Sequence, residues 1–289
     1  GLPTITPHSK TKPLNLISVM STHRKDIYVA SSTHKHLLNS IEVGDLELAK
    51  RLLIGVDINA QNNRGITALY KSVFHNRESL VHLLLKQGAD TNLPDHEGLT
   101  PLHVTALEDL DKLIPSLLDK GAELEAKDSY GYTPLHLATD QGNTKTARTL
   151  IERGANVNNR ADWDTTPLQS SIIRGSSKLV KLLLKIGADI TAKDRLGRSA
   201  LHWAAEKGHL SMAKFLILNG ALIHHQDNEG HTPLHEAARW DQQKMIRLLI
   251  FHGVNVNTKG VDGRTPLHIA IANGNMDIAE LLKRHGAKL

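Results

Sequence analysis

A four-residue pattern recurs seven times along the chain at a constant interval of 33 residues. It reads Thr-Pro-Leu-His or a close variant, and it begins at residues 67, 100, 133, 166, 199, 232 and 265. A glycine stands two residues before the pattern in six of the seven copies, and another glycine follows about 21 residues after its start. This fixed period predicts an array of stacked units, because no unit of this size can bury its apolar face alone.

The copy that begins at Thr232 shows how one unit is expected to fold. Thr232 suits a helix N-cap, and Pro233 suits the first helical position, where no backbone donor is needed. A short helix with small alanines follows, then a turn near residue 242 and a second helix with apolar residues at intervals of three and four. Gly253 is expected to end that helix in the left-handed conformation. The predicted order is therefore helix, turn, helix and extended finger.

The pattern Asp-x-x-Gly-x-Thr-Pro-Leu-His at this period closely resembles the ankyrin repeat. The resemblance covers residues 34–289 and implies an all-α solenoid, a curved array with a concave groove, in which each unit has two antiparallel helices and a β-hairpin finger. Eight units, the first of which lacks the Thr-Pro-Leu-His start, would span on the order of 80 Å at roughly 10 Å per unit. The units are expected at about residues 34–61, 62–94, 95–127, 128–160, 161–193, 194–226, 227–259 and 260–289. Residues 1–33 are expected to form a basic extension containing Ser, Thr and Pro, either disordered or partly helical.

Three kinds of departure from the pattern predict local irregularities. Asp164 replaces the finger glycine in one unit, and Asp tolerates the left-handed region better than most residues. Pro115 falls within a predicted second helix, where an interior proline costs about 3 kcal/mol and should kink or fray the helix. Tyr70 and Gln169 replace the histidine of the pattern in two further units.

The histidines of the pattern look like candidates for chemistry, but their spacing argues against it. Stacked units would hold them about one repeat apart, too far to share a metal ion whose histidine ligands must lie near 2 Å. The resemblance implies instead that each bonds backbone groups of its own or the neighbouring unit. These histidines are His103, His136, His202, His235 and His268.

The sequence gives no support for other kinds of catalytic site. The aspartates that open successive fingers are expected to accept backbone hydrogen bonds in turns, and their 33-residue spacing does not favour paired acid–base work. The sequence lacks a glycine-rich phosphate loop, a Gly-x-Ser-x-Gly elbow and a His-Glu-x-x-His motif. It contains no cysteine, so it has no disulfide or thiolate metal site. We therefore predict no catalytic residue, no metal and no cofactor.

Some residues do not recur from unit to unit and are expected to face the concave side. In the ankyrin family, the finger tips and the end of the first helix line that side and are not needed for stacking. Several of the chain's ten aromatic residues fall on this set, together with arginines, and Tyr, Trp and Arg are enriched at binding hot spots. The predicted partner-binding residues are Tyr130, Tyr132, Trp163, Arg174, Arg195, Arg198, Glu229, His231, Arg239, Trp240 and Arg264.

Asparagines close several units at the turn into the next finger. In animal members of the ankyrin family, an asparagine at this position can be hydroxylated, often with a leucine eight residues earlier. Asn92, Asn158 and Asn257 meet that spacing and are candidates for the modification.

The function expected from these observations is a non-enzymatic scaffold that binds a protein or peptide on its concave face. We expect the chain to be a monomer and to lie inside the cell, in the cytoplasm or nucleus. No apolar run approaches the roughly 20 residues that a membrane helix needs. An alternative is that the chain, from Gly1 to Leu289, is the sensor or scaffold segment of a larger effector, channel or immune receptor. A second alternative is nucleic-acid association through the N-terminal extension, since residues 1–36 carry a net charge of +4 out of +5 for the chain.

Overall fold

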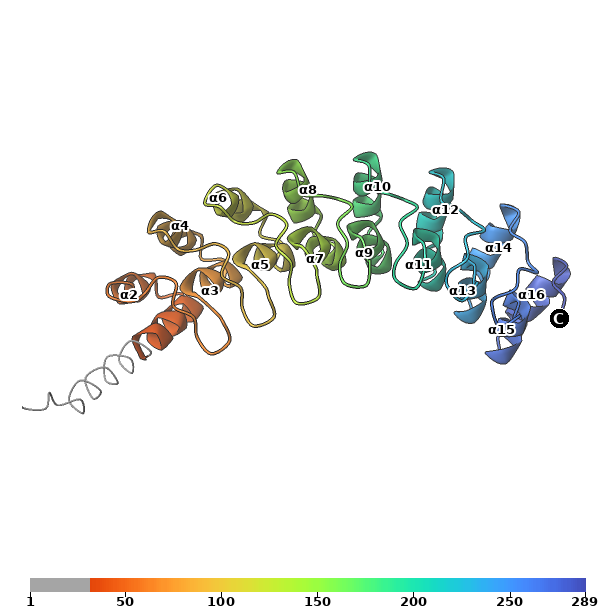
Figure 1. Cartoon of the computed structure of the whole chain (residues 1–289), viewed down its shortest axis with the longest axis horizontal. Helices are drawn as coiled ribbons and strands as arrows, with labels where there is room; N and C mark the ends of the chain where they lie inside the picture. Colours follow the sequence, from red (N-terminus) through yellow and green to blue (C-terminus); the bar gives the residue numbers. More distant parts are fainter. Residues whose placement is uncertain (1–31) are drawn as a thin grey trace, which may run out of the picture.

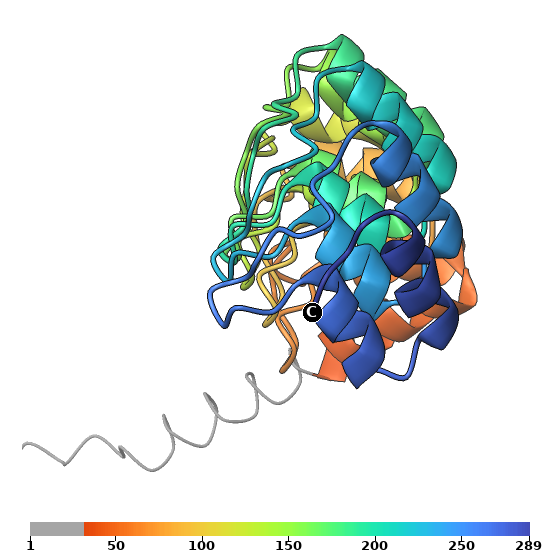
Figure 2. The ribbon, with the colours of Figure 1, turned by 90° about the vertical axis from the view of Figure 1, so that its right-hand side faces the viewer.

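The computed structural model describes residues 32–289, which form a row of helix pairs bent into an arc (Figure 1). The first helices of the pairs and the fingers lie on the inner side of the arc, and the second helices lie on the outer side. Seen along the row, the fingers form a layer of their own to one side of the helices (Figure 2). The predicted all-α solenoid is therefore confirmed.

The helices alternate between the two rows. A helix over residues 32–43 opens the described part of the chain. The inner row continues with α3 (Ala68–Phe74), α5 (Pro101–Leu107), α7 (Pro134–Gln141), α9 (Pro167–Arg174), α11 (Ala200–Glu206), α13 (Pro233–Arg239) and α15 (Pro266–Ala272). The outer row consists of α2 (Leu46–Leu52), α4 (Glu78–Lys86), η1 (Asp111–Leu113) with α6 (Ile114–Leu118), α8 (Thr144–Glu152), α10 (Ser177–Lys185), α12 (Leu210–Leu218), α14 (Gln243–Phe251) and α16 (Met276–Arg284).

The inner helices begin as their sequences predict. Thr133 has an extended backbone, and its hydroxyl accepts the backbone N–H of His136 at 3.5 Å. The His136 ring in turn accepts the Thr133 backbone N–H at 3.2 Å, which completes a reciprocal capping box. Pro134 follows at the start of the helix, where its missing donor costs nothing. Two orphan backbone donors are satisfied locally in this way, so the start of the helix does not depend on its neighbours.

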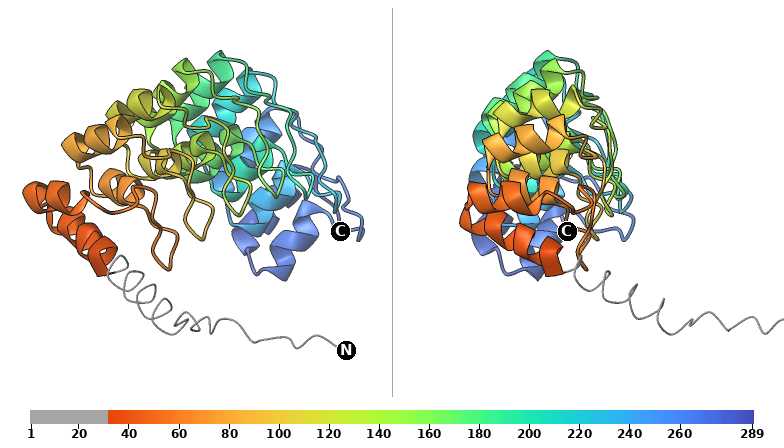
Figure 3. Two further views of the ribbon diagram at one scale, coloured as in Figure 1. Left: turned by 60° about the vertical axis from the view of Figure 1, so that its left-hand side comes forward. Right: turned by 90° about the vertical axis from the view of Figure 1, so that its left-hand side faces the viewer.

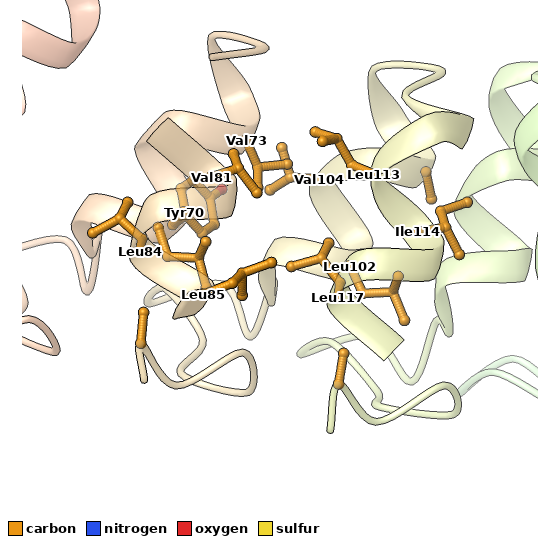
Figure 4. Close-up of a cluster of buried hydrophobic side chains, with 14 of the residues drawn as sticks. Tyr70, Val73, Val81, Leu84, Leu85, Leu102, Val104, Leu113, Ile114 and Leu117 are labelled. Atoms are coloured by element: carbon orange, nitrogen blue, oxygen red, sulfur yellow. The ribbon is translucent and has the colours of Figure 1, made fainter. Parts of the chain in front are cut away.

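The core runs lengthwise between the two rows. Its buried apolar side chains form two long clusters, and Ile151 and Val157 pack against both of them. Figure 4 shows a part of the first cluster, where Tyr70, Leu84, Leu102 and Leu117 bring side chains of α3, α4, α5 and α6 together. Each unit thus completes the core of the next one, as expected of a stacked array.

The fingers are shorter than the β-hairpins that the resemblance implied. Within residues 32–289 the only strand-like pairing is a single bridge between Lys193 and Ser199. Each finger is instead a tight turn, such as the one in which the backbone N–H of Asp95 donates to the Leu99 carbonyl at 2.9 Å. Only three residues separate these partners, which leaves no length for paired strands. The left view of Figure 3 shows the fingers following one another along the arc.

Successive fingers are linked to one another instead. The backbone N–H of His96 donates to the Arg64 carbonyl at 3.0 Å, and the same bond recurs one unit later from Ser129 to Glu97 at 2.9 Å. Four further bonds of this kind run to residues 162, 195, 228 and 261. The finger tips therefore form a continuous hydrogen-bonded edge along the inner side of the arc.

Pro115 disturbs the outer row as expected. The second helix of that unit is divided into the 3₁₀ turn η1 and the five-residue helix α6, and Pro115 lies in the first turn of α6. The proline is therefore not in a helix interior, because the chain has moved the helix start to accommodate it. The cost is a shorter outer helix in this unit.

Asp164 adopts the left-handed conformation with φ of 56°, where the other units have glycine. We expect Asp164→Gly to stabilise the fold by about 0.5–1 kcal/mol, because glycine has no Cβ to strain in this conformation. Asp164→Ala is expected to destabilise the fold, since alanine has a Cβ and lacks the short polar side chain with which Asp tolerates this conformation. Urea unfolding followed by the circular dichroism of the helices measures both changes. If the glycine variant is less stable than the native chain, Asp164 is not strained.

The N-terminal extension lies almost wholly outside the described residues. The sequence interpretation of residues 1–31, including the basic charges considered for nucleic-acid binding, is therefore not addressed by the structure. In residues 32–289, no helix is both long enough and apolar enough to cross a membrane.

Candidate functional site

Four of the five repeat histidines form hydrogen bonds that tie successive units together, and the fifth, His268, bonds Thr265 of its own unit. The His136 ring accepts the Thr133 backbone N–H at its Nδ1, so its proton is on Nε2, which donates to the Thr165 carbonyl of the next finger at 3.0 Å. His103 reaches the carbonyl of Tyr132 in the same way at 3.0 Å, and His202 that of His231 at 3.0 Å. His235 reaches the Arg264 carbonyl at 3.3 Å. The sequence interpretation of these side chains as architecture is confirmed.

Burial keeps these rings neutral. Desolvation lowers the pKa of His136, His202 and His235 to about 4, and it lowers the pKa of His103 as well. A proton on Nδ1 would also remove the acceptor that caps the helix. These histidines are therefore unsuited to proton transfer near neutral pH.

The two units without the histidine use other side chains for the same tie. The Gln169 carbonyl oxygen accepts the Thr166 backbone N–H at 3.0 Å, and its amide nitrogen donates to the Arg198 carbonyl at 3.3 Å. The Tyr70 hydroxyl donates to the Asp95 carboxylate at 2.8 Å. Six inner helices are thus hydrogen-bonded to the next finger through this position, four of them by histidine.

The asparagines that close the units form a second set of ties, on the opposite edge. The Asn158 amide nitrogen donates to the Gly187 carbonyl at 3.2 Å, and its oxygen accepts the Asp189 backbone N–H at 2.8 Å. Asn92 and Asn257 make the equivalent pairs of bonds. These bonds give the asparagines a structural role, and hydroxylation of Asn92, Asn158 and Asn257 stays a prediction.

Four of the predicted binding residues line one hollow on the finger side of the arc. Tyr132, Trp163, Arg195 and Arg198 surround a volume of about 350 Å³ between the fingers and the inner helices α7, α9 and α11. Further lining residues are Asp140, Thr165, Ser170, Ile173, Asp194, Leu196 and Trp203. The structure therefore brings aromatic rings, cations and carboxylates from three successive units together.

The arginines of this hollow are held against its aromatic rings. The Arg195 guanidinium lies 5.2 Å from the centre of the Trp163 ring, and that of Arg198 lies 3.6 Å from the Trp203 ring. Arg198 also pairs with Asp194 at 3.1 Å and Glu206 at 3.2 Å. Charge and stacking together fix these side chains before any partner arrives, which reduces the ordering cost of binding.

Asp140 is the carboxylate of the hollow that lacks such a partner. No cationic side chain of the described residues lies within ion-pairing distance of it, and its nearest polar contact is the Gln141 amide at 3.4 Å. Although the residue as a whole is exposed, desolvation of its carboxyl raises its pKa. The Trp203 indole N–H is unsatisfied here, because it is buried without a hydrogen-bond partner.

A second cluster lies in the unit that follows the hollow, beside α13. His231 is buried there, with its Nδ1 at 3.3 Å from both Arg239 Nη2 and Glu229 Oε2. Arg239 also donates to the carboxylate of Glu236, a residue that is only 3% exposed, at 3.0 Å. Desolvation raises the pKa of that carboxyl. The cluster therefore contains an ion pair with a buried carboxylate and a partly exposed arginine, in direct contact with a histidine.

Part of this cluster has the geometry of a metal site. Ligand atoms of Asp227, His231 and Glu236 lie within 4.8 Å of one another. The Arg239 guanidinium, however, already bonds both His231 and Glu236, and a divalent cation would have to displace it. These residues are accounted for by the ion pair without an ion.

The remaining predicted binding residues stand apart from these two groups. Tyr130 is 64% exposed at a finger tip, and Trp240 is 54% exposed at the end of α13. Arg174 ends α9, where its side chain packs over Gly142, and Arg264 pairs with Asp262 at 3.4 Å. The predicted binding residues therefore form one lined hollow, one partly buried ion-pair cluster and separate exposed side chains between and beside them.

Three members of these groups are not among the predicted binding residues, although Asp140, at the end of a first helix, is expected on the concave side. Asp140 and Trp203 line the hollow, and Glu236 anchors the ion-pair cluster. Trp203 and Glu236 occupy the same position of successive repeats, where other units have Lys71, Val104, Leu137, Ser170 and Ile269. Comparing corresponding positions of the units would have pointed to both, because four of the other five units have a small or aliphatic residue there and the fifth has Lys71.

The chain matches a known family model along nearly all of its length. The model is described as "Ankyrin repeats (3 copies)", and it matches residues 37–128, 75–161, 106–194, 156–227 and 201–289. Together these matches cover residues 37–289 without a gap. A search of curated proteins found no match.

Proposed function

The chain belongs to the ankyrin-repeat family, whose repeats are generally protein-interaction modules, and we propose that it is a non-enzymatic intracellular module that binds a protein or peptide segment on its concave face. The binding centre is the hollow around Tyr132 and Trp163. The partner segment extends from there along the finger tips toward Trp240.

The observation that carries this proposal is the hollow itself. Trp163 is 58% exposed there, although burying an aromatic ring of this size is strongly favourable. Its neighbour Arg195 already stacks on the ring, so both side chains are ordered without a partner. Exposed, pre-positioned Trp and Arg side chains around a concave volume are typical of binding hot spots.

The chemistry of the partner follows from the charges. The arginines offer donors for carbonyl or carboxylate groups, and the free carboxylate of Asp140 offers an acceptor for an amide or a cation. A peptide backbone with both kinds of group satisfies this surface. Catalysis lacks support, because burial lowers the pKa of the repeat histidines His103, His136, His202 and His235, and each is hydrogen-bonded to the neighbouring finger.

The test removes the two exposed tryptophans. We expect Trp163→Ala with Trp240→Ala to weaken binding at least tenfold, about 1.4 kcal/mol, because anchor aromatics dominate interface energies. The partner peptide is first selected by display against the native chain, and its affinity for each variant is then measured by calorimetry.

The control removes exposed apolar surface elsewhere. Val43 is 77% exposed and Ile54 is 83% exposed, both in the first unit and far from the hollow, so Val43→Ala with Ile54→Ala should leave the affinity unchanged. Equal affinities for the native chain and the tryptophan variant would refute the concave-face proposal.

A further inference from the structure

A second surface lies on the outer side of the arc and is independent of the concave face. The outer helices α8, α10, α12 and α14 carry eight Lys or Arg residues and a single acid, Glu152. All eight are exposed. They are Lys145, Arg148, Lys178, Lys181, Lys185, Lys214, Lys244 and Arg247.

The repeat period aligns these cations into rows. Arg148, Lys181, Lys214 and Arg247 recur at intervals of 33 residues and so occupy the same position on four successive outer helices. Neighbouring helices of a packed array lie roughly 8–10 Å apart, so the row presents one positive charge at about that spacing. Among the described residues, none of the eight cations is paired with a carboxylate within 4.0 Å.

An apolar hollow of about 530 Å³ lies beside this row, between α12 and α14. Its lining includes Leu210, Leu218, Leu248 and Phe251, and its charged side chains are Lys214, Lys244 and Arg247. Leu218 is 80% exposed and Phe251 is 83% exposed. A smaller hollow of about 250 Å³ follows between α10 and α12, over Val180, Met212 and Phe215.

This combination differs from an ordinary solvated helix face. The outer helices nearer the ends mix charge signs, as in the Lys50–Glu47 pair of α2 and the Arg284–Glu280 pair of α16. A face that only needs solubility has no reason to place Leu and Phe side chains in water beside four helices with eight cations and one acid. Contiguous apolar surface with a charged rim is typical of an interaction site.

We propose that this outer face binds an acidic amphipathic helix of a partner protein. Its apolar side chains would enter the hollow between α12 and α14, and its Asp and Glu side chains would pair with Lys181, Lys214 and Arg247. Helix-in-groove recognition of this type uses apolar anchors three and four residues apart, which suits a hollow flanked by a cation row.

Two other polyanions fit the surface less well. A phosphate backbone would neutralise the cations but would leave the aliphatic hollow unfilled. A flat bilayer would meet the surface only in part, because the outer helices follow the convex side of the arc (Figure 1). A peptide helix can satisfy both the charges and the hollow.

The experiment uses a synthetic 18-residue helical peptide with Glu along one face and Leu and Phe along the adjacent face. A peptide of the same composition but scrambled order serves as its reference. The affinity of each labelled peptide for the full chain is measured by fluorescence anisotropy. We expect saturable, salt-sensitive binding of the amphipathic peptide and at least tenfold weaker binding of the scrambled one.

Two variants locate the binding. Lys181→Glu with Lys214→Glu and Arg247→Glu should reduce the affinity at least tenfold, and Leu218→Ser with Phe251→Ser should do so without a charge change. All five side chains are exposed, so the fold should persist, which circular dichroism verifies. The matched control, Lys86→Glu with Lys112→Glu and Lys283→Glu, changes the net charge equally on other outer segments and should have little effect.

Several results would overturn the proposal. They are no binding of the amphipathic peptide, equal binding of the scrambled peptide, or an equal loss in the control variant. Tighter binding of duplex DNA or of phosphatidylserine vesicles than of the peptide would assign the surface to those ligands instead. The Trp163→Ala and Trp240→Ala variant should bind the peptide normally, which separates this test from that of the concave face.

Discussion

Acidification from pH 7 to pH 4.5 should destabilise the folded chain by several kcal/mol, largely through three buried histidines. In the unfolded chain a histidine has a pKa near 6.5, whereas burial lowers the pKa of His136, His202 and His235 to about 4 in the fold. Between these values the unfolded chain binds more protons than the folded one, so the free energy of unfolding falls as the pH falls. Each histidine should contribute roughly 2–3 kcal/mol of that loss at pH 4.5. Well above pH 6.5 the effect vanishes, because the rings are then neutral in both states.

The chain supplies its own control for this prediction. Gln169 makes the same tie with an uncharged amide. A variant with His136→Gln, His202→Gln and His235→Gln should therefore keep the ties and lose the acid sensitivity that the histidines cause. Urea unfolding of both proteins at pH 7 and pH 4.5 gives the stability that each loses on acidification. Both proteins have the same carboxylates, so the difference between the two losses reports the histidines alone. If both proteins lose the same stability on acidification, the neutral histidines are not the cause.

Gly98→Ala should destabilise the protein by about 1–3 kcal/mol more than Gly121→Ala. Both glycines are left-handed, with φ of 82° and 89°, so alanine is strained by about 1–2 kcal/mol at either position. Around Gly121 an added Cβ meets no atom within 4 Å. At Gly98 it would lie 2.8 Å from the backbone nitrogen of Ser129, which donates to the Glu97 carbonyl of the previous finger. The extra methyl must therefore push two fingers apart and break the bond between them.

Urea melts of the two alanine variants measure this difference. Hydrogen exchange at the Ser129 amide provides a second readout, because only Gly98→Ala should expose that amide. Equal stabilities for the two variants would show that the fingers adjust without cost. The same displacement should weaken partner binding on the concave face, since the finger tips form one edge of it.

Local features of this protein were readable from the sequence because their causes are local. The cap at Thr133 depends on residues three positions away, and the left-handed turn at Asp164 depends on its own backbone. The disturbance at Pro115 was equally predictable, because a proline lacks the donor that a helix interior requires. The length of the fingers was not, since the hydrogen bonds that hold them come from neighbouring fingers and not from strands within one unit.

The sequence by itself determined the period, the helix pairs and the ties between units, because a repeated residue solves the same packing problem in every copy. Only the tertiary structure decided which side chains that do not recur converge on one place. Asp140, Trp163 and Arg198 come from three units and meet in one hollow. The row of Lys181, Lys214 and Arg247 follows the 33-residue period, but only the structure places it beside an apolar hollow on the opposite face. The physical reason is that stacking brings corresponding positions of successive units side by side, so the residues that share a surface depend on how one unit packs on the next.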